Sequence, residues 1–70
     1  MKQILVIKEK CSDGTFDVYC KDYHFVGGGD TLEDAIEDMK NQMYYYKDTC
    51  TELSLEYPEF LDEPFELVIL

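Results

Sequence analysis

Cys20 and His24 are the pair of side chains best suited to nucleophilic catalysis. They lie four residues apart, so on one continuous strand they would share a face as a thiolate–imidazole pair. The intervening Lys21-Asp22 favours a turn, which would separate them. His24 is the only histidine, so acid–base chemistry has one imidazole and no visible partner for it. We therefore predict no catalytic residues and no enzyme activity, with His24 at the surface of a sheet.

Metal and phosphate binding are the next chemistries to consider. Hard cations prefer oxygen ligands, but the Asp-x-Asp-x-Asp-Gly spacing of a calcium loop is missing, and Asp17 is the one acid well inside a predicted strand. The glycine run at 27–29 is followed by acids rather than by lysine, which disfavours phosphate. We predict no metal and no cofactor, and a solvated helix face made by a dense group of carboxylates: Asp30, Glu33, Asp34, Glu37 and Asp38.

Three consecutive tyrosines, Tyr44 to Tyr46, lie in a predicted helix and must point in directions about 100° apart. Tyr46 fits the apolar stripe of that helix. Tyr44 and Tyr45 either contact another protein or pack beneath the segment 48–64, and the sequence leaves both alternatives open. Because tyrosine is enriched at interfaces, the predicted protein-binding residues are Tyr44, Tyr45, Glu37 and Asp38.

The charge narrows the class of partner. The chain has sixteen acidic residues, six lysines and no arginine, which gives a net charge of −10. Nucleic acids and anionic membranes attract basic surfaces, and arginine is the usual phosphate ligand. We expect neither of these partners, whereas the same field would attract a basic protein.

The length and the cysteines set the remaining limits. Seventy residues form one domain, 1–70, whose core is small enough that a homodimer or higher homo-oligomer is expected. Three cysteines without a Cys-x-x-Cys pair indicate reduced thiols. The apolar run Ile4–Ile7 is too short for a signal peptide or a membrane span, which favours a cytoplasmic location.

The elements that carry these residues can be read from turn signals and periodicity. Ile4–Ile7 and Thr15–Cys20 are predicted strands joined by an Asp13-Gly14 hairpin turn. The second strand alternates, with one face made by Phe16, Val18 and Cys20. Tyr23–Val26 is a third strand, which makes a three-stranded antiparallel meander. The strand 65–70 is expected to join the sheet, so the predicted fold class is α+β.

The helix start is the strongest local signal. The three glycines at 27–29 are expected to turn the chain sharply through positive φ angles. Thr31 then caps the helix, and Asp34 is expected to reach back to the Thr31 N–H. The residues with this structural role are Gly29, Asp30, Thr31 and Asp34.

The helix end and the segment after it are less clearly marked. An apolar stripe made by Leu32, Ala35, Ile36, Met39, Met43 and Tyr46 predicts a helix that ends near Lys47. Residues 48–64 contain two prolines, and residues 57–61 are either one turn of helix or a loop pinned by aromatic side chains.

This order of elements, with the Asp13-Gly14 turn and the stretch Gly29-Asp30-Thr31-Leu32-Glu33-Asp34-Ala35, resembles the HicB-like family. These are antitoxin partners of small RNA-cleaving HicA toxins, with a partial RNase H-like β-β-β-α-β domain. The chain departs from the family at residues 24–28, where members carry a Pro-Gly-Cys-like segment. It also has no room for the DNA-binding segment that many members add.

The resemblance implies an antitoxin-type module that binds and occludes a small basic ribonuclease without binding an operator. The alternative is a self-assembling structural or small-ligand-binding domain with no toxin partner. It would associate through Tyr44, Tyr45 and an exposed strand edge.

Overall fold

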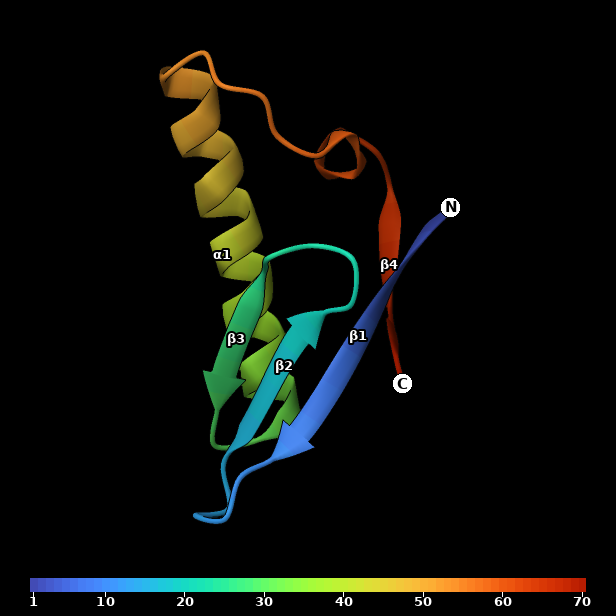
Figure 1. The fold of residues 1–70 in the computed structure, drawn as a ribbon, viewed down its shortest axis with the longest axis vertical. Coiled ribbons are helices and arrows are strands. Elements are labelled where there is room, and N and C mark those ends of the chain that lie inside the picture. The colour runs from blue at the N-terminus through green and yellow to red at the C-terminus, as the bar shows by residue number, and fades with distance from the viewer.

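Four strands form one sheet, and a single long helix lies across part of one face (Figure 1). The computed structural model describes residues 1–70. The elements are β1 (Lys2–Lys10), β2 (Phe16–Cys20), β3 (Val26–Gly29), α1 (Leu32–Glu52), the 3₁₀ helix η1 (Glu59–Asp62) and β4 (Phe65–Ile69). The predicted α+β class is confirmed.

The sheet is mixed, with the strand order β3-β2-β1-β4. The antiparallel pairs β1–β2 and β2–β3 form a three-stranded meander as predicted. Its third strand is Val26–Gly29 and not the predicted Tyr23–Val26, because residues 21–24 form a bend. However, β4 pairs parallel to β1, with Leu67 opposite Ile4. The meander therefore describes only three of the four strands. The mixed character arises because α1 carries the chain back across the sheet, so β4 starts at the same end as β1.

The hairpin between β1 and β2 turns where Asp13-Gly14 predicted. Gly14 has φ +89°, which a side chain would disfavour. The Asp13 carboxylate accepts hydrogen bonds from the Thr15 hydroxyl at 2.7 Å and the Thr15 N–H at 3.0 Å. Both bonds lower the pKa of Asp13 below its usual value, and the bond from the hydroxyl has the larger effect.

The glycines at 27–29 have a different role from the predicted one. They form strand β3 without a positive φ, so the expected sharp turn is wrong. A Cβ atom at Gly27 would lie 2.4 Å from the Ala35 carbonyl oxygen and 2.5 Å from the Met39 nitrogen. At Gly29 it would lie 2.7 Å from the Cβ of Asp34. The missing side chains therefore let α1 pack directly on the backbone of β3.

The start of α1 agrees with the sequence in its main feature. Thr31 has extended φ and ψ angles, and its hydroxyl accepts a hydrogen bond from the Asp34 N–H at 3.1 Å. The Asp34 carboxylate does not return a bond to the Thr31 N–H, so the cap is one-sided. Glu33 and Asp34 still place negative charge at the positive end of the helix dipole.

The end of α1 lies five residues beyond the predicted end at Lys47, at Glu52. Cys50 continues the buried stripe at 3% exposure, which holds the extra turn against the rest of the protein. Ser54 ends the helix with φ 57°. Its N–H donates to the Thr51 carbonyl and the Leu55 N–H donates to the Cys50 carbonyl, which is a Schellman motif without its usual glycine.

The core lies between α1 and the inner face of the sheet. Met39 and Met43 of α1 are fully buried against Val6 and Val18, as the predicted stripe and the alternation in β2 required. Ten buried residues form one cluster: Ile4, Val6, Val18, Cys20, Phe25, Ala35, Met39, Met43, Phe60 and Leu61.

Residues 57–62 close the end of the sheet with one short turn, η1, which is the helical alternative for this segment. Phe60 of η1 is buried at 3% exposure. Its ring lies 4.6 Å from the ring centroid of Tyr23, 5.1 Å from that of Phe65 and 6.2 Å from that of Phe25. Phe60 thus joins η1 to β4 and to the segment between β2 and β3.

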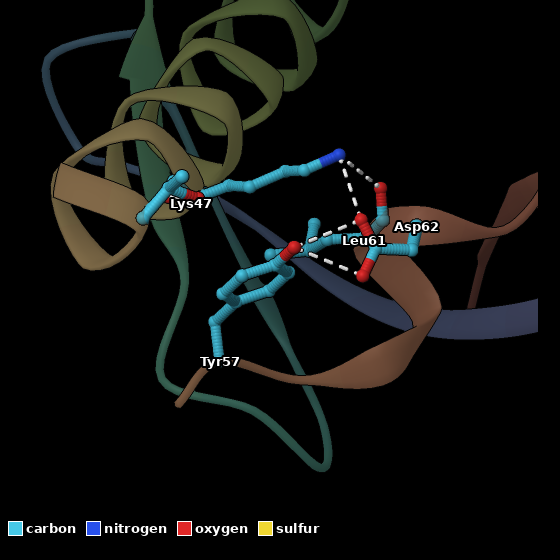
Figure 2. A network of polar contacts seen from close by, with 5 residues as sticks. Lys47, Tyr57, Leu61 and Asp62 are labelled. Carbon is cyan, nitrogen blue, oxygen red and sulfur yellow. Dashed lines mark hydrogen bonds and ion pairs between the residues drawn. The ribbon is translucent and has the colours of Figure 1, made fainter. Parts of the chain in front are cut away.

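A polar latch formed by Lys47, Tyr57 and Asp62 fastens η1 to α1 (Figure 2). The Lys47 ammonium lies 2.9 Å from the Asp62 carboxylate and donates to the Leu61 carbonyl at 3.3 Å. The Tyr57 hydroxyl donates to both Asp62 carboxylate oxygens at 2.9 Å. Lys47 therefore holds the following segment, and it does not mark the end of the helix as predicted.

The latch predicts an acid-sensitive contribution to stability. Hydrogen bonds from Lys47 and then Tyr57 lower the pKa of Asp62 below its usual 3.8. The pKa is depressed in the folded state, so the contribution is complete above the unfolded value. It is lost as the pH falls through the folded value. Asp62→Asn is expected to flatten the loss of stability below pH ~4, measured by urea unfolding at several pH values.

The matched control is Glu52→Gln, which removes one negative charge from an exposed side chain outside the latch. The free energy of unfolding of this variant is expected to fall with decreasing pH in the same way as that of the unchanged protein. Equal flattening in both variants would attribute the effect to net charge and contradict the role of the latch.

Candidate interaction surface

The three tyrosines of α1 point in three directions, and the structure excludes one of the two alternatives for Tyr44 and Tyr45. Tyr46 packs its ring edge-on against Phe25, with the centroids 5.6 Å apart. Tyr44 and Tyr45 are 51% and 73% exposed. The segment after the helix does not cover them, so packing beneath residues 48–64 is wrong. Tyr44 and Tyr45 therefore lie open on the helix, and Tyr46 beside Phe25 is itself 44% exposed.

The two predicted acidic partners of these tyrosines differ in their surroundings. Glu37 is exposed and lines a shallow hollow on α1 with Tyr44 and Asn41. Asp38 is half-buried, and its carboxylate accepts a hydrogen bond from the Gly28 N–H at 3.0 Å. Glu37 is thus free for a partner, whereas Asp38 already binds the outer edge of β3.

Apart from Thr31, the residues predicted to start the helix fall into two kinds. Gly29 provides the close approach to Asp34 described above. Asp30 and Asp34 are exposed at the positive end of α1. These side chains add to the acidic field around the helix start.

A groove between α1 and β4 was not predicted. Its volume is about 540 Å³, and it is lined by Ile36, Lys40 and Tyr44 of α1 and by residues 63–67 and 69. Its apolar side chains Phe65, Leu67 and Ile69 are half-buried. The alternation Phe65-Glu66-Leu67-Val68-Ile69 was the available signal, but only the placement of β4 beside α1 creates the groove.

The structure separates the two candidate catalytic side chains. Cys20 is 4% exposed, with its sulfur 3.8 Å from that of Met39. Burial, followed by the charge of Asp22, raises the pKa of its thiol to about 11. His24 is exposed, but it lies in the bend at residues 21–24 and not in a strand as predicted. Cys20 therefore lies in the core, and its raised pKa favours the neutral thiol.

The other chemistry-bearing residues are dispersed. No group of three or more histidine, cysteine or acidic side chains is arranged to hold a metal ion. All three cysteines are free thiols. Asp17 lies on the exposed face of β2 and accepts a hydrogen bond from the Cys11 thiol at 3.3 Å.

Comparison of this sequence and fold with known proteins identifies no family. No helix has the combination of length and apolar character needed to cross a membrane. No family model, no curated protein and no solved structure shows a significant match to this sequence.

Proposed function

We propose that this protein is an acidic protein-binding module of the HicB-like antitoxin type, which binds and occludes a small basic ribonuclease. The observation that carries the proposal is the exposure of Tyr44 and Tyr45, with the carboxylate of Glu37 in the same hollow as Tyr44. Large rings supply buried area at low entropic cost, and the surrounding acids supply attraction for a basic partner.

Two further observations support the proposal. The element order β-β-β-α-β is the order that the resemblance implies. The net charge of −10 without arginine suits a protein partner rather than a nucleic acid. The site of action in this proposal is the cytoplasm, where three free thiols remain reduced.

The test is retention of a basic ribonuclease from the native host lysate on the immobilised protein. We expect retention at low salt, release at high salt, and inhibition of the retained ribonuclease by the free protein. Glu37→Lys and Tyr45→Ala are each expected to weaken retention about tenfold or more.

The matched control is Glu56→Lys, which makes the same charge change at an exposed position outside α1. It is expected to retain the ribonuclease nearly as well as the unchanged protein. If no basic ribonuclease is retained and inhibited, the proposed function is rejected. If all three variants lose retention equally, the assignment of binding to this surface is rejected.

The second candidate function is a self-assembling structural or small-ligand-binding domain. It is favoured by the open sheet face opposite α1, where Leu5, Ile7 and Val68 are half-buried and Val26 is 62% exposed. Assembly of this kind is expected to be unaffected by Glu37→Lys, which separates it from ribonuclease binding.

A further inference from the structure

The edge of the sheet at β4 is open. The strand order β3-β2-β1-β4 makes β4 an edge strand, which pairs with β1 alone, and the two strands cross in the view of Figure 1. The Leu70 N–H donates to the Val6 carbonyl at 2.8 Å. Backbone groups alternate along a strand, so the N–H groups of Phe65, Leu67 and Ile69 face away from β1. Such a row of unpaired groups is a template for another strand.

The composition of β4 leaves this edge unprotected. Natural edges are commonly guarded by lysine, proline or a bulge. β4 has the sequence Phe-Glu-Leu-Val-Ile, with Glu66 as its one charged residue and no bulge in its pairing with β1. Leu70, directly after it, is 57% exposed.

The opposite edge, at β3, is closed. The Asp38 carboxylate of α1 binds the outward Gly28 N–H at 3.0 Å. The helix also packs on the β3 backbone at Gly27 and Gly29. An added strand would have to displace the Asp38 carboxylate from the Gly28 N–H. The sheet thus has one edge available for pairing and one that is occupied.

The occupant that fits the open edge is a second copy of this chain. Two β4 edges related by a twofold axis present identical, self-complementary rows of donors and acceptors. The α1–β4 groove beside this edge contains Lys40 together with Glu63 and Glu66. Two copies that meet at this groove can place the lysine of one copy near the glutamates of the other. If they met through the outer face of α1, acidic side chains of both copies would lie close together and repel. A basic partner is better matched by that acidic helix face.

We propose that two copies of this protein pair antiparallel through β4 to form a continuous eight-stranded sheet. Pairing would complete the burial of Phe65, Leu67 and Ile69, which are half-buried in one copy. Assembly ends at the dimer because the β3 edges, the remaining edges of the joined sheet, are closed by Asp38. This inference goes beyond the proposed function and does not depend on a ribonuclease partner.

The test is sedimentation equilibrium of the complete chain over about 10–200 µM protein, since dimer populations depend on concentration. A dimer with no larger species is expected. Val68→Glu adds a like charge to each strand on the sheet face opposite α1, and it is expected to weaken the dimer about 100-fold or more. Val26→Glu is the matched control: it makes the same change on β3, and the dimer is expected to persist.

A backbone readout distinguishes this interface from any other dimer. The amide of Leu67 is expected to exchange slowly with deuterium in the dimer and rapidly in Val68→Glu, while the core amides of both proteins stay protected. Raising the salt from about 0.05 to 0.5 M is expected to leave the dimer unchanged or strengthen it, because salt screens the repulsion between two acidic copies.

A monomer across the whole concentration range would overturn the proposal. So would a dimer that survives Val68→Glu, or one that Val26→Glu dissociates equally. Each of these results is independent of whether a basic ribonuclease binds, so the failure of this inference and the failure of the proposed function are distinguishable.

Discussion

Gly27→Ala is expected to destabilise the protein by about 3 kcal/mol, the upper end of the range for overpacked sites. The added Cβ would lie 2.4 Å from the Ala35 carbonyl oxygen and 2.5 Å from the Met39 nitrogen. Both are helix backbone atoms, so no side-chain rotation relieves the overlap. Either α1 shifts away from β3, or the strand leaves the sheet. Urea unfolding followed by circular dichroism measures the effect.

Gly28→Ala is the matched control on the neighbouring residue. Its added Cβ would meet the Asp17 carboxylate at 3.1 Å, and that side chain is exposed and can move at the cost of only its bond from the Cys11 thiol. The change in stability is expected to stay within about 0.5 kcal/mol, as at other surface positions. Similar losses in both variants would mean that the glycines matter for their backbone freedom and not for the close approach of α1.

Phe60→Ala is expected to cost about 3–5 kcal/mol, the usual range for a buried aromatic residue. A 70-residue domain has a free energy of unfolding of about 4–10 kcal/mol. The variant is therefore expected to melt more than about 10 °C lower, given 4–8 °C for each kcal/mol in a domain of this size. The cause is the loss of the ring that contacts Tyr23, Phe25 and Phe65.

Two variants separate this effect from a general loss of aromatic surface. Phe60→Leu keeps most of the volume and is expected to cost about 1–1.5 kcal/mol. Tyr45→Ala removes a ring that is 73% exposed and is expected to change stability by about 0.5 kcal/mol or less. A melting temperature for Phe60→Ala close to that of Tyr45→Ala would contradict the role of Phe60 in holding β4.

The elements that the sequence predicted correctly depend on short-range interactions. The Asp13-Gly14 turn and the Thr31 cap are each set by contacts within a few residues of one another. The stripe through Met39 and Met43 is a local periodicity, although its side chains are buried against distant strands. Alternation in β2 likewise identified Val18 as a core residue. The four strands and the one helix of the α+β class follow from these local patterns and from the pairing they favour.

The elements that the sequence misplaced depend on a distant neighbour. The glycines at 27–29 carried a turn signal, but the approach of α1 made them a strand. Thr49 and Thr51 are poor helix formers, but burial of Cys50 extended the helix beyond the predicted end to Glu52. Lys47 resembled a helix end until Asp62, fifteen residues away, provided its ion-pair partner.

The candidate interaction surfaces also depend partly on local sequence and partly on distant contacts. The sequence alone determined the net charge, the missing arginines and the fact that three adjacent tyrosines cannot all be buried. The tertiary structure decided which of them are exposed, assigned Asp38 to the β3 edge and left β4 as the open edge. The physical reason is that composition and local periodicity are properties of neighbouring residues. Exposure and edge pairing depend instead on which segments, far apart in the chain, pack against one another.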